Sequence, residues 1–344
     1  MRPRLAVRTG RVIGLLLVGL AVIGLTTWGA GVLYFTAPGG PGVRATLPVL
    51  LGLAALATLG ALFSRRWRWR GLTIFAVLLL SIAAWWSSLR PSNDRVWQPE
   101  VARVASATVQ GDLVTVRNIR NFDYRTETDF TPRYEERTYD LRRLDRVDLV
   151  AVYWMGPAIA HIFLSFGFGD DHLAVSIEAR KERGEGYSAL GGFFRQYELI
   201  YIVADERDVI RLRTNYRKDP PEDVYVFRAH APIENGRRIF LEYLRAINEL
   251  AERPQFYNTL TANCTNVILM HARINPGHVP FSWKILLSGY APEYVHATGR
   301  LDQSLPFEEL KRRSHVNAAA QAADQAPDFS HRIRAGLPGT AAAP

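Results

Sequence analysis

Residues 161–180, HIFLSFGFGDDHLAVSIEAR, contain the pattern that decides the fold of the larger part of this chain. Apolar residues alternate with other residues on both sides of Gly169-Asp170-Asp171, as expected for two half-buried strands joined by a turn. The two apolar faces consist of Ile162, Leu164, Phe166 and Phe168 in the first strand and of Leu173, Val175, Ile177 and Ala179 in the second. We therefore expect an antiparallel hairpin with one buried face.

The hairpin also places two chemically useful side chains together on its other face. If Ile162 pairs with Ala179, every apolar residue lies on the same side, whereas a slip by one residue would bury polar groups. His161 then lies diagonal to Glu178, and diagonal neighbours are about 7–8 Å apart, within reach of long side chains. The pattern predicts His161 as a general base and Glu178 as the carboxylate that orients it.

A purely structural interpretation of these two residues stays open. A histidine at the start of a strand is usually a surface residue, and this chain has eight histidines. Glu178 could equally form surface ion pairs with Arg180 or Lys181.

The only cysteine, Cys264, lies in the run YNTLTANCTNVILMH, where turn-favouring residues precede an apolar helical pattern. We expect a helix from Cys264 to about Ala272 with Asn263 as its N-cap. Backbone N–H groups and the helix dipole at such a position favour thiolate over thiol, so an unusually acidic thiol is expected. Cys264 is therefore the candidate nucleophile, and its own backbone N–H is a candidate oxyanion donor. The alternative is a buried structural cysteine.

His271 is the rival base, because it follows Cys264 by seven residues and shares its helix face. Two helical turns separate the two residues by about 10 Å along the axis, which is too far for a thiol–imidazole hydrogen bond. We therefore favour His161.

Other strands and one further helix complete the predicted domain. Strand-like segments lie near residues 113–116, 138–141, 149–153, 199–203 and 224–228. A helix of about residues 233–253 repeats apolar residues at intervals of three and four. Since the sheet precedes the cysteine helix, the sequence predicts an α+β domain with an antiparallel sheet. The glycines of RGEGYSALGG predict a mobile loop between Arg183 and Gly192, a candidate lid.

The first 90 residues form a separate block that holds ten arginines, no lysine and no acidic residue. The whole chain has 42 basic and 33 acidic residues, so the remainder is nearly neutral, which argues against a nucleic-acid partner. Neither an HExxH motif nor a CxxC pair occurs, and we expect no metal site and no cofactor.

Three uncharged spans, about 12–36, 46–64 and 71–89, are each near the roughly 20 residues that a bilayer requires. Arginines cluster before the first span and between the second and third, which predicts a cytoplasmic N-terminus and three crossings. The alternative for the first span is a cleaved signal peptide. We thus expect a multi-pass membrane domain (1–90) in a bacterial inner membrane, a periplasmic thiol-enzyme domain (91–313) and a disordered tail (314–344).

Several linked motifs resemble one bacterial family. They are RNFDYRTETDFTPRYEERTYDL, AHIFLSFGF, SIEARKE, QYELIYIVADERDVIRLRTNYR and FYNTLTANCT, spread over about residues 114–301. They are similar to the family named after the periplasmic domain of Lnb, a lipoprotein N-acyltransferase. The resemblance implies a permuted papain-like (NlpC-type) thiol fold in which the histidine strand precedes the cysteine helix, with Cys264 as nucleophile and His161 as base.

The resemblance also implies an activity, namely transfer of an acyl chain from a phospholipid through a thioester to the N-terminal amine of a lipoprotein. Two other functions remain open from the residues. One is a cysteine amidase or peptidase that cuts cell-wall peptides with the same dyad and water as acceptor. The other is a non-enzymatic, membrane-anchored binding module that has kept the thiol fold.

Overall fold

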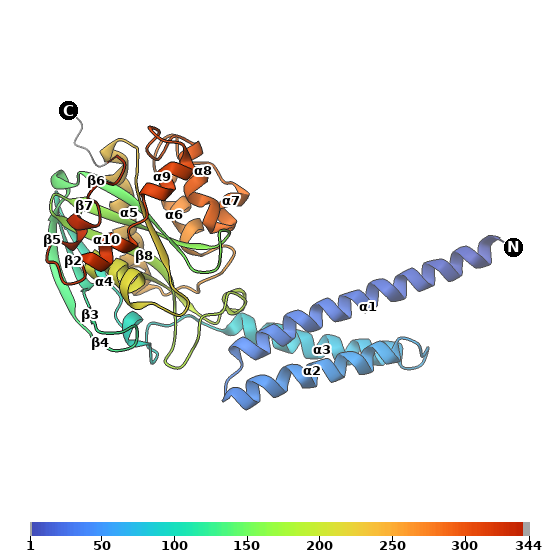
Figure 1. Cartoon of the computed structure of the whole chain (residues 1–344). Helices are drawn as coiled ribbons and strands as arrows, with labels where there is room; N and C mark the ends of the chain where they lie inside the picture. Colours follow the sequence, from blue (N-terminus) through green and yellow to red (C-terminus); the bar gives the residue numbers. More distant parts are fainter. Residues whose placement is uncertain (1, 340–344) are drawn as a thin grey trace. The chain divides into compact units, whose positions relative to one another are not determined.

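The computed structural model describes residues 2–339, with side chains from Thr9 onward, and comprises two compact units (Figure 1). The membrane unit is the chain up to Pro91 together with the segment Ser188–Gln196. The sheet unit is the remainder of the described chain.

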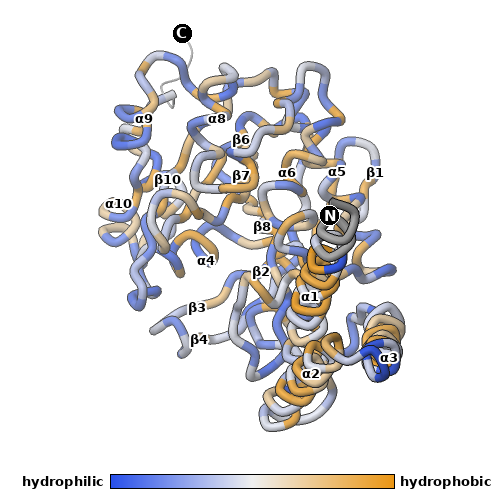
Figure 2. Tube along the Cα trace, turned by 90° about the vertical axis from the view of Figure 1, so that its right-hand side faces the viewer, coloured by the Kyte–Doolittle hydropathy of each residue, from blue (hydrophilic) through white to orange (hydrophobic). Residues whose placement is uncertain are grey.

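The membrane unit contains three long apolar helices, α1 (Arg2–Thr36), α2 (Pro41–Ala61) and α3 (Arg68–Ser88). Each has the length and composition to cross a membrane. Leucines such as Leu16 and Leu80 are more than 60% exposed, and the tubes of α1 and α2 are largely apolar in Figure 2. Such surfaces require hydrocarbon around them, which confirms the prediction of three N-terminal apolar helices.

The segment Ser188–Gln196 is held inside the membrane unit by aromatic contacts. The Phe194 ring stacks on Phe35 at 5.5 Å, and Trp86 Nε1 donates a hydrogen bond of 3.2 Å to the Phe194 carbonyl. The Arg195 guanidinium lies 4.1 Å from the centre of the Trp86 ring. The second half of the loop that the glycines predict to be mobile is therefore packed against helices in this structure.

The sheet unit is built on an eight-stranded sheet with the order β1-β2-β9-β8-β7-β6-β10 and with β5 paired to β2. These strands are β1 (Ser106–Gln110), β2 (Leu113–Arg120), β5 (Tyr134–Asp140), β6 (Arg146–Tyr153), β7 (Ala160–Phe168), β8 (Asp171–Arg180), β9 (Glu198–Ala204) and β10 (Asp223–Arg228). A small separate ladder joins β3 (Asp123–Tyr124) to β4 (Phe130–Thr131). All seven predicted strands are present, and the α+β class is confirmed.

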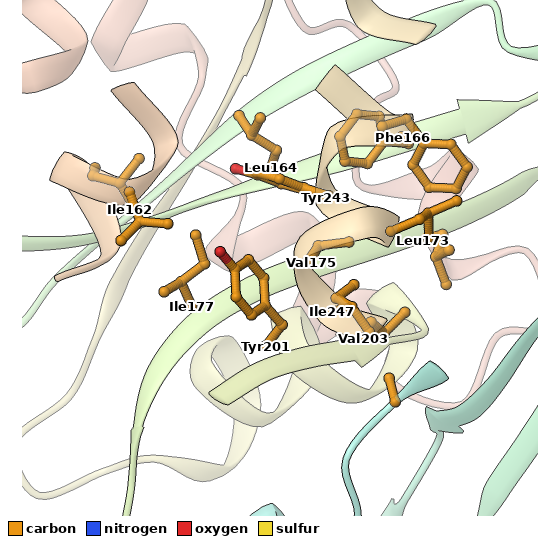
Figure 3. Close-up of a cluster of buried hydrophobic side chains, with 14 of the residues drawn as sticks. Ile162, Leu164, Phe166, Leu173, Val175, Ile177, Tyr201, Val203, Tyr243 and Ile247 are labelled. Atoms are coloured by element: carbon orange, nitrogen blue, oxygen red, sulfur yellow. The ribbon is translucent and has the colours of Figure 1, made fainter. Parts of the chain in front are cut away.

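Helices cover both faces of the sheet. One face packs on α5 (Ile233–Glu252) and α6 (Cys264–Ala272) through a large apolar core. Figure 3 shows this core, in which Ile162 and Leu164 of β7 lie on the sheet face that Tyr243 of α5 covers. The other face packs on α4 (Glu206–Arg211), α10 (Asn317–Ala322) and α11 (Phe329–Arg332). The remaining helices of this unit are α7 (Trp283–Leu286), α8 (Ala291–Ala297) and α9 (Phe307–Arg313).

The hairpin of β7 and β8 keeps the predicted faces but not the predicted register. Leu164 pairs with Val175 and Phe168 with Asp171, a shift of two residues from the expected pairs. The reason is a tighter turn of two residues, with Gly169 at a φ of 71° in the first central position, as type II′ hairpins require. Because the shift is even, no side chain changes face.

The prediction of a disordered tail from residue 314 is wrong for the part that the structure describes. Val316, Phe329 and Ile333 are buried in the second core, and Arg334 is buried in an ion-pair network. The Ala- and Gln-rich composition hid these contacts, because one apolar residue per helical turn is enough to cover a narrow strip of sheet.

The Arg334 network joins the end of the chain to the sheet. Its guanidinium lies 2.5 Å from Glu206 and 2.8 Å from Asp148, and Ser165 donates a hydrogen bond to Glu206. Burial alone would raise the pKa of Glu206, but the charge of Arg334 outweighs it and lowers that pKa to about 2.

Replacing Arg334 tests the importance of this end of the chain. Arg334→Ala leaves the buried Glu206 without its cation, while Asp148 keeps its ion pair with Arg228. We therefore expect a loss of about 3–5 kcal/mol in unfolding free energy. Thermal unfolding of the full chain in detergent measures it. The matched control is Arg332→Ala, whose pair with Asp328 is about half exposed and should cost under about 1 kcal/mol. Equal stability of the two variants would contradict the assigned role of the network.

Candidate active site

Cys264 begins α6 and lies against the sheet. The Asn263 side chain caps the helix by accepting a hydrogen bond of 2.9 Å from the Asn266 backbone N–H. The Cys264 sulfur faces the backbone N–H of Ile162, which favours its ionised form, and it lies 3.7 Å from the Thr265 hydroxyl. The cap and the helix start thus deliver the thiol to β7, directly beside the residue that follows His161.

A break in strand pairing makes room for this contact. The β7–β8 ladder runs from Phe168 with Asp171 to Leu164 with Val175, and no further pair of these two strands occurs in the described chain. Ile162 lies beyond the last pair, so its N–H is free to bind sulfur instead of a carbonyl of β8. The site therefore lies where the two strands part.

His161 and Glu178 meet across this opening. The observed register, continued beyond the last pair, places them opposite each other, closer than the diagonal arrangement that the sequence predicts. The His161 Nε2 atom lies 3.7 Å from Glu178 Oε1 and 2.6 Å from Ser176 Oγ. Ser176 in turn donates a hydrogen bond of 2.8 Å to Glu178 Oε1.

These hydrogen bonds fix the tautomer of the imidazole. The single hydroxyl proton of Ser176 is committed to the carboxylate, which is acceptor-only when ionised. Ser176 must therefore accept from Nε2–H of His161, which leaves the lone pair on Nδ1. Within the described residues Nδ1 has no hydrogen-bond partner, so it is the nitrogen that can take a proton.

Arg213 holds the negative charge of Glu178 in place. It comes from the π-helical turn Leu212–Tyr216, a rare element that is frequent at functional sites. One guanidinium nitrogen lies 3.1 Å from Glu178 Oε1, and another lies 3.4 Å from Glu222. The proposed pairing of Glu178 with Arg180 or Lys181 does not occur, because Arg180 bonds instead to Asn93 and to backbone carbonyls.

The electrostatics of the site favour a neutral His161 beside an ionised Glu178. Burial, aided by the positive charge of Arg213, lowers the pKa of His161 to about 3. Burial tends to raise the pKa of Glu178, but Arg213 and the other cations around it hold that pKa well below its usual value. Glu178 is therefore ionised and His161 neutral at physiological pH.

The thiol is less acidic than the sequence predicts. Burial raises the pKa of Cys264, and the charge of Glu178 adds to this, although the N–H of Ile162 and the Thr265 hydroxyl act in the opposite direction. In the part of the chain that the structure describes, no hydrogen bond joins the Cys264 sulfur to the His161 imidazole. The resting site therefore holds a neutral thiol and a neutral imidazole rather than a preformed ion pair.

His271, the rival base, is committed elsewhere. Its Nε2 atom lies 2.7 Å from the Tyr201 hydroxyl, and its Nδ1 atom lies 3.6 Å from Glu242. The side chain is 3% exposed and stacks edge-on against Tyr243. Both ring nitrogens thus have partners within the core.

Sequence reasoning missed several residues of the site. Arg213 and Glu222 come from a segment without any motif, and only the pairing geometry reveals them. Tyr187 and Tyr257 lie near Cys264: burial raises the pKa of both phenols, and the charge of Cys264 adds to this. Ser176 could have been found, since the expected hairpin already places it on the face of His161 and Glu178.

The fold and site define a class: an α+β domain, in a chain with three helices able to span a membrane, in which a cysteine begins a helix packed on β7 and a histidine of β7 bonds a serine–carboxylate pair. The family model of the Lnb N-terminal periplasmic domain matches residues 130–289, which include His161, Glu178 and Cys264. Residues 130–289 therefore match the family that the sequence motifs resemble, a periplasmic domain family, and three helices able to span a membrane precede this match in the chain. No curated protein and no solved structure matched the chain.

The pH dependence of alkylation tests the neutral resting pair. A raised thiol pKa means less thiolate at any given pH, so iodoacetamide should label Cys264 slowly at pH 7 and faster only above the ordinary thiol pKa of about 8.5. His161→Ala should shift the midpoint of this pH profile by no more than about half a pH unit, because the imidazole carries no positive charge near pH 7.

The chain has a single cysteine, so label incorporation reports on one site, and Cys264→Ser provides the blank. A rate plateau that is already reached below pH 7 and is abolished by His161→Ala would instead demonstrate a thiolate–imidazolium pair.

Proposed function

We propose that this protein is a membrane-anchored cysteine acyltransferase. The observation that carries the proposal is the sulfur of Cys264, which faces Ile162 N–H at the strand opening where His161, Ser176 and Glu178 interact. A thiol, a base and an orienting carboxylate are the parts that nucleophilic acyl transfer requires.

In the first step, His161 Nδ1 takes the thiol proton and the sulfur attacks an acyl ester of a phospholipid. The ionised Glu178, acting through Ser176, stabilises the imidazolium that forms. The N–H groups at the start of α6, including that of Cys264, stabilise the oxyanion. His161 then returns its proton to the leaving alcohol, and a thioester remains on Cys264.

In the second step, an amine attacks the thioester and releases the thiol. The acceptor that the family resemblance suggests is the N-terminal amine of a lipoprotein. Three membrane-spanning helices support a lipid donor, because tethering beside a bilayer raises the effective concentration of lipid. By the positive-inside rule we place the N-terminus in the cytoplasm of a bacterial inner membrane and the sheet unit in the periplasm.

Acyl capture is the direct test. The full chain, incubated in detergent with phospholipid that carries a labelled acyl chain, should gain one hydroxylamine-sensitive label per molecule. Cys264→Ala should gain none. His161→Ala should acylate about 10²–10⁴-fold more slowly, the usual contribution of a general base.

Two controls separate the alternatives. His331→Ala removes a half-exposed histidine that pairs with Asp170 outside the site and should acylate at the normal rate. Absence of a thioester together with cleavage of cell-wall peptides would replace the proposal by the amidase function. Absence of both, with an unchanged cellular phenotype of Cys264→Ala, would favour a binding module.

A further inference from the structure

An apolar cavity of about 170 Å³ lies beside the thiol in the sheet unit. Its walls come from one face of the sheet, from α5 and α6, and from the short helices α7 and α8. The cavity is apolar because its lining includes the aliphatic side chains of Ile162, Leu164, Ile268, Leu269, Ile285 and Val295. Figure 3 shows Ile162 and Leu164 on the sheet face that this cavity borders.

One end of the cavity reaches the residues that hold the sulfur. Ile162, whose N–H faces Cys264, contributes its side chain to the wall, as does Thr265, the next residue after Cys264. The wall then follows α6 from Thr265 to Ala272, a distance of about 10 Å at the helical rise. The cavity therefore starts next to the nucleophile, at its neighbours Ile162 and Thr265, and runs along α6.

The far end of the cavity is polar. Asn275 lines it, is 6% exposed, and has a buried Oδ1 atom without a hydrogen-bond partner. Arg300 and His278 line the same region. Binding of an apolar ligand is thus favoured along α6 and disfavoured beyond its end.

We propose that this cavity binds a hydrocarbon segment of the acyl chain attached to Cys264. The inference rests on the proposed function for the identity of its ligand. An apolar cavity of about 150 Å³ in another protein accommodates a benzene molecule, so this one has room for about six carbons. The cavity therefore takes only part of a long acyl chain and selects for chains of at least about that length.

Alkyl methanethiosulfonates test the cavity independently of acyl transfer. The thiolate of Cys264 attacks the sulfenyl sulfur of the reagent, a disulfide forms, and methanesulfinate leaves, so no acyl chemistry is involved. Since each buried methylene favours binding by about fourfold, the hexyl reagent should label the full chain at least tenfold faster than the methyl reagent.

Two variants of α6 provide the comparison. Ala272→Leu fills the far part of the cavity and should lower the hexyl-to-methyl rate ratio by about tenfold, with little change in the methyl rate. Met270→Leu, on the exposed side of the same helix, should leave the ratio unchanged. Both variants are measured in the same detergent, so partition of the reagent into micelles cancels.

An identical ratio in Ala272→Leu and Met270→Leu, or no preference for the hexyl reagent, would overturn the cavity proposal even if phospholipid acylates Cys264. Conversely, the expected ratios without any thioester from phospholipid would sustain a hydrocarbon site and overturn the proposed function alone. Far-UV circular dichroism and the methyl rate show whether each variant is folded with its thiol accessible.

Discussion

The candidate site depends on one contact, between the backbone N–H of Ile162 and the sulfur of Cys264. It exists because β7 and β8 stop pairing after Leu164 and Val175, which frees the N–H for a partner from outside the sheet. The same opening gives His161 access to Ser176 and Glu178.

The charges around this opening are arranged to keep the base uncharged. A buried carboxylate next to imidazole would by itself attract a proton to the ring. Arg213 counters this, because it neutralises Glu178 and repels an imidazolium at the same time. Under the proposed function, His161 becomes charged only as a negative charge develops on sulfur during attack on a carbonyl. The proposal therefore has His161 act as a general base during the reaction, with no thiolate formed beforehand.

Much of the architecture could be predicted from the sequence, because it follows from periodicity. The faces of the hairpin, the amphipathic α5 and the start of α6 at Cys264 all follow from local patterns. The register could not be predicted, since faces fix only its parity, and the turn that settles it depends on Gly169. Arg213 and the raised thiol pKa depend on burial created by distant segments. The folded end of the chain was missed because its burial is due to Arg334 and a few apolar residues in a polar context.

The loop between β8 and β9 affects how the sheet unit would behave if it were produced without the helices. Phe194 packs on helices α1 and α3, through Phe35 and Trp86. A fragment that begins after Pro91 would keep the whole sheet and the cysteine, yet its β8–β9 loop would present bare aromatic rings to water. Such a fragment would be prone to aggregation, and polar substitutions at Phe193 and Phe194 would reduce that tendency.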